Sequence, residues 1–343
     1  MHATLIVPAP FSTVSGGYGY DRRIVSGLRD LGHEVAVVAL PGQHPVPDAV
    51  ARDAACAALD RLVAGTKTVI DGLALPAFAG LEDALSALGA IGLIHHPTSR
   101  EHGLDEAVQR RLREIEQRLL PRLRRIVVTS PLTAETLAKD FGVDAGRIAV
   151  VTPGTDDAPR ATGSGGAICE ILSIGTLIPR KGHDLLLRAL ARLFDLDWRL
   201  TVVGSESADP VCAAALHVLV EELGIVHRVR FMGAVVCDAL EALWHSADLF
   251  ALSTHYEGYG MVIAEALKRG LPIVVTNGGA AGALLTPEAG LVCPVDDRDQ
   301  VSKSLRRVIF GTELRREIAD HAWKLGQTLP TWADQAALFA GAL

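Results

Sequence analysis

Residues 253–272 have the sequence STHYEGYGMVIAEALKRGLP and directly follow a short apolar run, Leu249–Leu252. A buried strand, a glycine-containing loop and a helix in succession are typical of the connections within a parallel sheet covered by helices. Gly258 and Gly260 permit a close approach of the backbone to a ligand. The stretch therefore predicts an α/β domain with a ligand site at a helix start.

Two acids of this stretch are candidate ligand-binding groups. Glu257 lies in the predicted loop and Glu265 about two turns into the predicted helix, so both can face one ligand from different heights. We expect one carboxylate to accept sugar hydroxyls and the other to hold a ribose, while amides at the helix start bind phosphate. The alternative is structural, with Glu257 complementing the helix dipole and Glu265 solvated. The residues expected at the helix start are Gly258, Tyr259, Gly260, Met261 and Val262.

A second segment carries two adjacent cations. Residues 173–190, SIGTLIPRKGHDLLLRAL, predict a strand that ends at Gly175, a loop with Arg180 and Lys181, and then a helix. Two cations beside a helix amino terminus suit a diphosphate, and an arginine can bind two of its oxygens at once. The alternative is that both charges are simply solvated.

Short apolar runs alternate with helical patterns along the whole chain, which predicts parallel sheets covered by helices. Residues 152–166 are rich in Thr, Pro, Gly, Asp and Ser, as surface linkers are. We therefore expect an α/β protein of two facing Rossmann-like domains, with doubly wound parallel sheets and a catalytic cleft between them. The expected parts are a first domain at 1–155, a linker at 156–166, a second domain at 167–320, and a C-terminal helix at 321–343 that packs back toward the first domain.

The strands themselves follow from the positions of the apolar runs. In the first half they are expected at 3–7, 33–40, 69–73, 91–95, 126–129 and 149–151. In the second half they are expected at 168–173, 199–203, 229–232, 249–252 and 272–276.

Ser15–Tyr20 is predicted to be a glycine-rich turn before a helix that begins at Asp21. The amides of Gly16 and Gly17 could approach an anion there, and a tight turn that needs only small residues is the alternative. The stretch lacks the GxGxxG spacing, and the next strand ends without an acid to hold a ribose. Both features disfavour a nicotinamide-dependent dehydrogenase.

His95 and His96 end a predicted strand. Because the last side chains of parallel strands face the ligand site, we expect at least one of the two imidazoles to meet a substrate. Alternatively, the pair caps the strand or binds a backbone carbonyl.

Composition narrows the class of protein. With 343 residues, 49% of them hydrophobic, the chain can bury two cores. The net charge of −7 argues against nucleic-acid binding. The five cysteines have no metal-ligand spacing, which indicates reduced core residues. The chain has no basic leader and no apolar run of roughly 20 residues, so we expect a soluble cytoplasmic protein, at most attached to the inner membrane surface.

One helical stretch is strongly basic. It could bind anionic lipid, as basic amphipathic helices do, but a solvated helix face is the favoured interpretation. Its cations are Arg110, Arg111, Arg113, Arg118, Arg122, Arg124 and Arg125, opposed by Glu114 and Glu116.

The pattern Glu257, Gly, aromatic, Gly, four residues, Glu265, then Gly270, apolar, Pro272 resembles the signature of retaining glycosyltransferases of family 4, which have the GT-B fold. The resemblance covers nearly the whole chain. Its further elements are Gly16–Val35, which resembles the opening loop, helix and strand entry of that family, Ile94–His95, Val151–Asp156 with its Pro-Gly-x-Asp, and the Phe-x-Gly of Phe231 and Gly233.

This resemblance implies a role for each matching residue. Glu257 would contact the donor sugar, Glu265 the nucleotide ribose and Lys181 the diphosphate. His95 would lie near the reacting centre, while His96 stands where many relatives have another residue and is a secondary candidate. Gly17 and its neighbours, among them Gly16, would line the phosphate side, and Gly233 would lie near the base. Gly175 and Val235 are further candidates for binding the nucleotide sugar. The first domain would bind the acceptor and the second the nucleotide sugar.

Two positions depart from the family pattern. Thr176 stands where the family usually has an arginine, and we expect Arg180 to supply the missing cation beside Lys181. Family members also often carry a glutamate shortly after a Gly-Gly pair, whereas Gly278 and Gly279 lead to alanines. The glutamate that would contact the nucleotide in other family members is therefore absent here, or another residue replaces it.

The predicted function is transfer of a sugar from a UDP- or GDP-sugar to a hydroxyl of a saccharide, lipid-linked or small-molecule acceptor, with retention at the anomeric carbon. The predicted catalytic groups are His95, Glu257, Arg180 and Lys181. Because the cations and helix amides would stabilise the charge on the leaving phosphate, no metal or other cofactor is expected. That phosphate could also take the acceptor's proton. The alternative enzyme is a nucleotide-sugar epimerase of the same fold, and intact Glu257, Glu265 and Lys181 speak against a non-catalytic binding protein.

Overall fold

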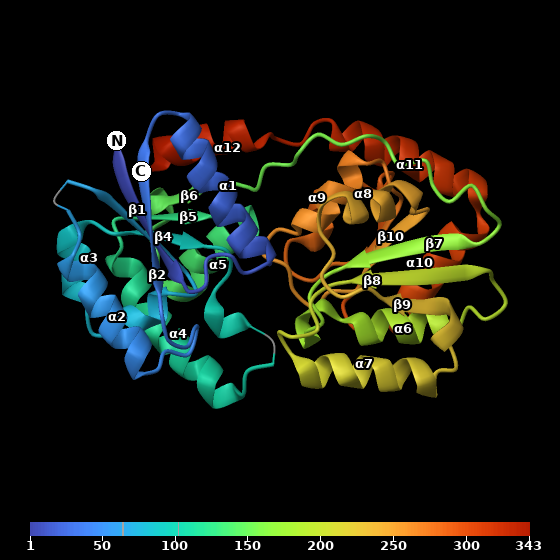
Figure 1. Cartoon of the computed structure of the whole chain (residues 1–343), viewed down its shortest axis with the longest axis horizontal. Helices are drawn as coiled ribbons and strands as arrows, with labels where there is room; N and C mark the ends of the chain where they lie inside the picture. The colour runs from blue at the N-terminus through green and yellow to red at the C-terminus, as the bar shows by residue number, and fades with distance from the viewer. Residues whose placement is uncertain (64, 102) are drawn as a thin grey trace. The chain divides into compact units, whose positions relative to one another are not determined.

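The chain divides between two units in a computed structural model that describes residues 1–63, 65–101 and 103–343. The first unit contains Met1–Gly154 and Pro330–Leu343, and the second contains Thr155–Leu329. Each unit has its own six-stranded parallel sheet with helices packed against it (Figure 1). The predicted α/β class with two Rossmann-like sheets is therefore confirmed.

The first sheet has the strand order β2-β1-β3-β4-β5-β6. All six strands predicted in this half are present within two residues of the expected bounds. Since β2 and β3 lie on opposite sides of β1, the order reverses between β1 and β3, and ligands of such sheets bind outside the carboxyl ends at that point. The strands are β1 (His2–Pro8), β2 (Glu34–Leu40), β3 (Lys67–Asp71), β4 (Ile91–Ile94), β5 (Arg125–Val128) and β6 (Ile148–Val150).

Helices cover this sheet, and one apolar cluster joins Ile6, Ile70 and Ile126 of the strands to the helices on that face. The helices of the first unit are α1 (Gly16–Asp30), α2 (Ala49–Asp60), α3 (Glu82–Leu88), α4 (Glu106–Leu119), α5 (Pro131–Phe141) and α12 (Trp332–Ala342). Short 3₁₀ helices are η1 (Leu75–Phe78), η2 (Thr98–Arg100), η3 (Leu120–Arg122) and η4 (Ala145–Arg147).

The predicted turn at Ser15–Tyr20 is wrong, because α1 already begins at Gly16. Ser15 precedes the helix with an extended backbone, φ −153°. Tyr20 shares the buried face of the helix with Ile24, and its hydroxyl donates to Val151 O at 3.0 Å. Burial of this aromatic side chain extends the helix back through the glycines, which therefore form its first turn.

The second sheet has the order β12-β11-β10-β7-β8-β9. The five strands predicted here are present within one residue, and the short β12 was not predicted. Alternate residues pack into different cores: Ile171 lies in one apolar cluster and Leu172 in another, so both faces of the sheet are covered. The strands are β7 (Cys169–Ile174), β8 (Trp198–Val203), β9 (Val229–Phe231), β10 (Leu249–Leu252), β11 (Ile273–Thr276) and β12 (Gly290–Cys293).

The helices of the second unit are α6 (His183–Ala191), α7 (Pro210–Glu222), α8 (Cys237–Ser246), α9 (Met261–Lys268), α10 (Arg298–Phe310) and α11 (Thr312–Gly326). Its 3₁₀ helices are η5 (Pro179–Lys181), η6 (Val226–Arg228) and η7 (Ala281–Leu284). Residues 156–166 contain no helix or strand and belong to the second unit. They are fixed there by contacts such as the ion pair of Asp157 with the buried Lys268, 2.9 Å.

The C-terminal segment 321–343 forms parts of two helices rather than the one predicted. Helix α11 ends at Gly326, and a capping box in which Thr331 and Asp334 bind each other's backbone amides starts α12 after Pro330. Within the first unit α12 packs on α1, with the rings of Tyr20 and Trp332 edge to face at 5.8 Å. No helix in the described part of the chain is long and apolar enough to cross a membrane.

Candidate active site

The centre of the second sheet brings the two predicted ligand-binding segments together. Strands β7 and β10 are neighbours there, and the strand order reverses between them. In doubly wound sheets ligands bind outside the carboxyl ends of the strands at such a point. The segment with η5 follows β7, and the segment 253–260 follows β10. The topology therefore places Arg180 and Lys181 beside Glu257.

The contacts among these three side chains are direct. Lys181 Nζ donates to Glu257 Oε1 at 2.6 Å, and Arg180 Nη1 lies 3.7 Å from Glu257 Oε2. Arg180 Nη1 also donates to Tyr256 O at 2.7 Å, and the Thr254 hydroxyl lies 3.0 Å from Glu257 Oε1. The exposed fractions of the Lys181, Arg180 and Glu257 side chains are 12%, 15% and 9%. We call these three side chains the Glu257 cluster.

Lys181 and Arg180 determine the charge state of Glu257. Burial alone would raise the pKa of Glu257, but the charges of Lys181 and Arg180 outweigh burial and hold this pKa below its ordinary value. The carboxylate is therefore ionised at neutral pH. Arginine and lysine side chains at a strand end suit an anion such as a diphosphate.

Backbone contacts lock the segments after β7 and β10 onto each other. Gly182 has a φ of +60°, and a Cβ on it would lie 2.0 Å from Ser253 O. Ser253 Oγ donates to Gly182 O at 2.5 Å, and His255 N donates to Arg180 O at 2.8 Å. Only glycine fits at position 182, so the cations are held where the chain after β10 passes.

Gly278 and Gly279, which follow β11, hold Glu257 from the other side. Glu257 N donates to Gly278 O at 3.1 Å, and Ala280 N donates to Glu257 O at 2.8 Å. A Cβ on Gly279, whose φ is +62°, would lie 2.3 Å from Glu257 O. The sequence pattern did not indicate this packing role for the glycine pair.

The start of α9 lies directly after this site. Gly260 has a φ of +99° and precedes Met261, the first helical residue. Met261 and Val262 are partly exposed in the first turn, and Glu265 is partly buried in the next. Burial raises the pKa of Tyr259 to about 12, so its hydroxyl is neutral. Gly258 is partly exposed beside Glu257.

The remaining predicted donor residues of this unit follow β7 and β9. Gly175 lies under Lys181, because a Cβ on it would be 3.1 Å from Lys181 Cδ. Gly233 has a φ of +65°, and its carbonyl accepts from Gly204 N at 2.9 Å. The backbone of Gly204 in turn approaches Gly175 so closely that a Cβ would be 1.9 Å from Gly175 O. Val235 is partly exposed beyond Gly233.

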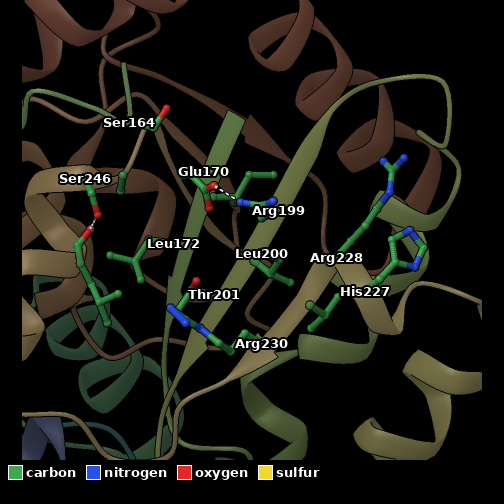
Figure 2. Close-up of a pocket in the computed structure, with 14 residues that line it drawn as sticks. Ser164, Glu170, Leu172, Arg199, Leu200, Thr201, His227, Arg228, Arg230 and Ser246 are labelled. Atoms are coloured by element: carbon green, nitrogen blue, oxygen red, sulfur yellow. Dashed lines mark hydrogen bonds and ion pairs between the residues drawn. The ribbon is translucent and has the colours of Figure 1, made fainter. Parts of the chain in front are cut away.

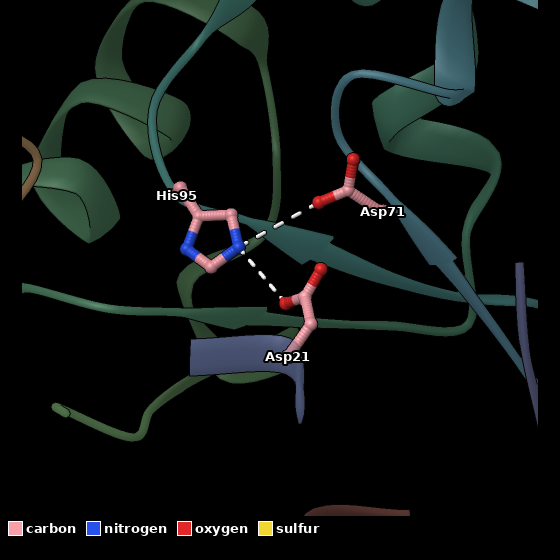
Figure 3. Close-up of side chains that lie close together, drawn as sticks. All are labelled: Asp21, Asp71 and His95. Atoms are coloured by element: carbon pink, nitrogen blue, oxygen red, sulfur yellow. Dashed lines mark hydrogen bonds and ion pairs between the residues drawn. The ribbon is translucent and has the colours of Figure 1, made fainter. Parts of the chain in front are cut away.

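In the first unit His95 follows β4 and binds two acids that the sequence analysis missed. His95 Nε2 lies 3.1 Å from Asp21 Oδ1 of α1 and 3.6 Å from Asp71 Oδ2 at the end of β3 (Figure 3). The two aspartate side chains are almost fully buried, and that of His95 is 17% exposed. Gly17 lies against the ring, since a Cβ on it would be 3.4 Å from His95 Cδ2, and Gly16 starts the helix.

This buried group has unusual protonation equilibria. Burial alone would lower the pKa of His95, but Asp21, by charge and hydrogen bond, and Asp71 outweigh burial and raise it. Burial, followed by the charge of Asp21, raises the pKa of Asp71 to about 7. Burial and both acids raise the pKa of Tyr18 to about 12. The group therefore binds protons more strongly than its free side chains do.

His96 belongs to a different environment. Its Nε2 lies 2.8 Å from Glu101 Oε2, so the two adjacent histidines pair with different acids. The structure thus separates His95, in the buried group, from the secondary candidate His96.

Two family models match the chain over adjacent ranges that correspond closely to the two sheets. The model described as "Glycosyltransferase Family 4" matches residues 20–158, and the model described as "Glycosyl transferases group 1" matches residues 162–324. The chain belongs to glycosyltransferase family 4.

The chain is similar to the D-inositol 3-phosphate glycosyltransferase of Rhodococcus opacus, with 30% identity over 233 residues. The match covers 61% of this chain and 52% of that relative. The chain spans about half the length of the curated relatives it matches. Among solved structures, sucrose-phosphate synthase of Thermosynechococcus elongatus aligns with a TM-score of 0.84 at 18% identity, covering 99% of this chain and 98% of that one. Anabaena Alr3699/HepE in complex with UDP-glucose aligns with a TM-score of 0.77 at 17% identity over 100% of both chains. The GT-B fold is therefore confirmed.

A separate pocket of the family 4 chain lies away from the Glu257 cluster. It has a volume of about 640 Å³ and is formed near the amino ends of β7, β8 and β9 (Figure 2). Glu170, Arg199 and Arg230 line it, and Arg199 Nη1 lies 3.4 Å from Glu170 Oε1. None of the predicted site residues lines this pocket, so its side chains provide controls for tests of the site.

Proposed function

We propose that the chain transfers a sugar from a UDP- or GDP-sugar to an acceptor hydroxyl. The observation that carries the proposal is the Glu257 cluster, in which two cations and one carboxylate meet at the point where the strand order of the second sheet reverses. A nucleoside diphosphate sugar needs both kinds of group, since its phosphates attract cations and its hydroxyls donate to a carboxylate. The nucleotide sugar named in the Alr3699/HepE complex, UDP-glucose, is of this class.

In the proposed reaction the bond from the anomeric carbon to the β-phosphate oxygen breaks, and the acceptor oxygen bonds to the same face of that carbon. Negative charge then grows on the leaving phosphate, where Arg180, Lys181 and the first amides of α9 stabilise it. The acceptor's proton passes to the leaving phosphate. In this proposal Glu257 orients the donor sugar, Glu265 binds the ribose, and Gly233 and Val235 lie near the base.

We propose that no metal ion is needed, because the fixed cations Arg180 and Lys181 supply the positive charge that a metal would provide. This proposal is tested by assaying transfer after exhaustive chelation and after adding divalent metals. Unchanged rates support it, and a rate that requires added metal contradicts it.

Donor and acceptor are found with a panel assay. The whole chain is incubated with UDP- and GDP-sugars, with and without an acceptor panel of sugars, polyol phosphates and lipid extract, and release of free UDP or GDP is measured. NMR of the product then gives the configuration at the anomeric carbon. Acceptor-dependent release with retained configuration is expected. Donor isomerisation without release would identify an epimerase instead.

Matched variants locate the activity. Glu257→Gln should abolish most transfer, because it removes the negative charge and replaces one of the two oxygens that accept from sugar hydroxyls by an NH2 donor. Glu170→Gln in the separate pocket should leave the rate unchanged. Equal rates of Glu257→Gln and the wild type would remove the Glu257 cluster from the mechanism.

We also propose that the protein acts in the cytoplasm, because Cys56, Cys169, Cys212 and Cys293 form no disulfide.

For the basic stretch in α4 and η3 the contacts favour a solvated helix face: Arg113 lies over the Phe141 ring at 5.8 Å and Arg118 lies 3.8 Å from Glu82. Co-sedimentation with anionic vesicles at low and moderate salt tests peripheral membrane binding. Pelleting with vesicles would show that this face binds lipid after all.

A further inference from the structure

In the buried group of Asp21, Asp71 and His95, two acids lie beside the same edge of the imidazole ring. Both carboxylates approach the same ring nitrogen, Nε2, at 3.1 Å and 3.6 Å. Figure 3 shows Nδ1 on the far side of the ring, turned away from both carboxylates. A neutral imidazole with a bare Nε2 would direct a lone pair at two buried acids, which is unfavourable. The arrangement therefore favours a proton on Nε2.

The other groups around His95 do not offset these two acids. From α1, the ring of Tyr20 contacts that of His95 at 5.2 Å, and Tyr18 lies near the two acids. Both phenols are neutral because their pKa values are raised. The hydroxyls of Thr129, directly after β5, and of Thr133, in α5, donate to the backbone carbonyl of His95, each at 3.3 Å, and not to its ring. Among the described residues, the electrostatic influences on the ring are those of Asp21 and Asp71.

A buried carboxylate pair without a cation is costly, and the imidazole is the group placed to supply one. Asp71 Oδ1 accepts from Leu73 N at 2.8 Å, which leaves Oδ2 for the ring. Protonation of both ring nitrogens gives the acids their counter-charge and makes Nδ1 a hydrogen-bond donor as well.

We propose that Asp21 and Asp71 are positioning residues that hold His95 as an imidazolium, so that His95 takes part in transfer as a cation and Nδ1–H donor and not as a general base. The part of this inference that concerns transfer rests on the proposed function, whereas the protonation state does not. A cation that donates from Nδ1 suits an anionic oxygen of a substrate, such as a phosphate oxygen.

The protonation state is measured by NMR on the whole chain labelled with ¹⁵N-histidine. The His95 signals are assigned by their loss in His95→Gln, and the ring nitrogens are followed from pH 5.5 to 9. We expect His95 to remain an imidazolium at pH 7.5, where an ordinary histidine is neutral. A neutral His95 ring at pH 7.5 in the wild type would overturn the inference.

Isosteric variants assign the cause. Asp21→Asn should lower the pKa of His95 by about 1–3 units, because an opposite charge within contact distance shifts a pKa by that amount. Glu101→Gln is the matched control, since Glu101 pairs with the neighbouring His96, and it should leave the His95 titration unchanged. A His95 titration that Asp21→Asn does not move would contradict the assignment.

The same three side chains offer ligand atoms within 4.8 Å of one another, as a metal site would. A bound metal would occupy Nε2 and exclude the proposed proton. We expect elemental analysis of the purified chain to find no metal that is stoichiometric in the wild type and lost in Asp71→Asn. Finding one would overturn the inference.

The pH dependence of transfer separates a cation from a base. If His95 acts as an imidazolium, kcat/KM falls as the pH rises through its pKa, and in Asp21→Asn this fall moves to lower pH. A merely structural role would lower the rate equally at every pH. A fall on the acid side, as for a general base, would overturn the inference. If His95 is an imidazolium but the chain transfers no sugar, the inference on its protonation state stands and the proposed function is wrong.

Discussion

Lys181 Nζ and Glu257 Oε1 lie 2.6 Å apart although 76 residues separate them in the chain. The pair exists because β7 and β10 are neighbours in the second sheet, and the segments that follow both strands leave the same edge. A nearly buried salt bridge contributes little net stability but leaves an uncompensated charge if one partner is removed. A sequence retains such a pair more readily when the charges serve a ligand.

Lys181→Met should therefore destabilise the second unit. At pH 7 the variant leaves Glu257 ionised with only the more distant Arg180, and we expect the free energy of unfolding to fall by about 2–3 kcal/mol. Because the folded pKa of Glu257 is depressed, the contribution of its charge is present above its ordinary pKa and is lost as the pH falls through the folded value. The difference between the two proteins, measured by urea unfolding, should shrink toward pH 3. A difference that does not depend on pH would show that packing and not charge is responsible.

Arg180→Ala tests whether Arg180 replaces the arginine that the family pattern places at Thr176. Calorimetric titration with UDP and GDP should show at least a tenfold loss of affinity, about 1.4 kcal/mol. Adding Thr176→Arg to this variant should recover part of the affinity. Arg199→Ala in the separate pocket is the control and should bind as the wild type does. Unchanged affinity in Arg180→Ala would end the idea of compensation.

Gly279→Ala tests the backbone that holds Glu257. The new Cβ would meet Glu257 O at 2.3 Å in a residue with a φ of +62°, so the Glu257 segment must move. We expect transfer to fall at least tenfold and the free energy of unfolding to fall by about 2 kcal/mol or more. Gly224→Ala is the matched control, because its φ of +68° is similar and no atom lies within 4 Å of its Cβ. It should lose about 1 kcal/mol and keep its activity. Similar activity losses in both variants would contradict a specific role for Gly279.

Stability of the first unit should fall as the pH rises. The pKa of Asp71 is about 7 in the folded chain, well above its unfolded value, so the folded state binds an extra proton between about pH 4 and 7. The raised pKa of His95 adds stability that is complete below its unfolded value and is lost as the pH passes the folded value. Asp71→Asn should weaken the decline in Tm between pH 5 and 8, whereas Asp53→Asn on the exposed face of α2 should not. A steeper decline in Asp71→Asn would reverse the assigned direction.

The sequence predicted most strands because each is an apolar run set off by polar loops, and Leu249–Leu252 is found with the bounds expected. It missed β12, whose four residues begin with Gly290 and carry too weak a strand signal. It also misplaced the start of α1, since Gly16 and Gly17 suggest a turn, and only the burial of Tyr20 extends the helix through them.

At the candidate site the sequence singled out Lys181 and Glu257 separately, and the order of the strands brings them together. Asp21 and Asp71 were missed because no local pattern connects them to each other or to His95. The available signal was weak: Asp71 is an acid at the end of an apolar strand, at the same sheet edge as His95. Burial of two acids around one imidazole is visible only in three dimensions.

The most direct test of the account is acceptor-dependent release of UDP or GDP from a nucleotide sugar by the whole chain. We predict release by the wild type and by Glu170→Gln, and a rate at least a hundredfold lower for Glu257→Gln, since the loss of one interaction in a transition state commonly costs about that much. No release from any UDP- or GDP-sugar with any acceptor, or equal release by Glu257→Gln and the wild type, would contradict the proposal that the Glu257 cluster carries sugar transfer.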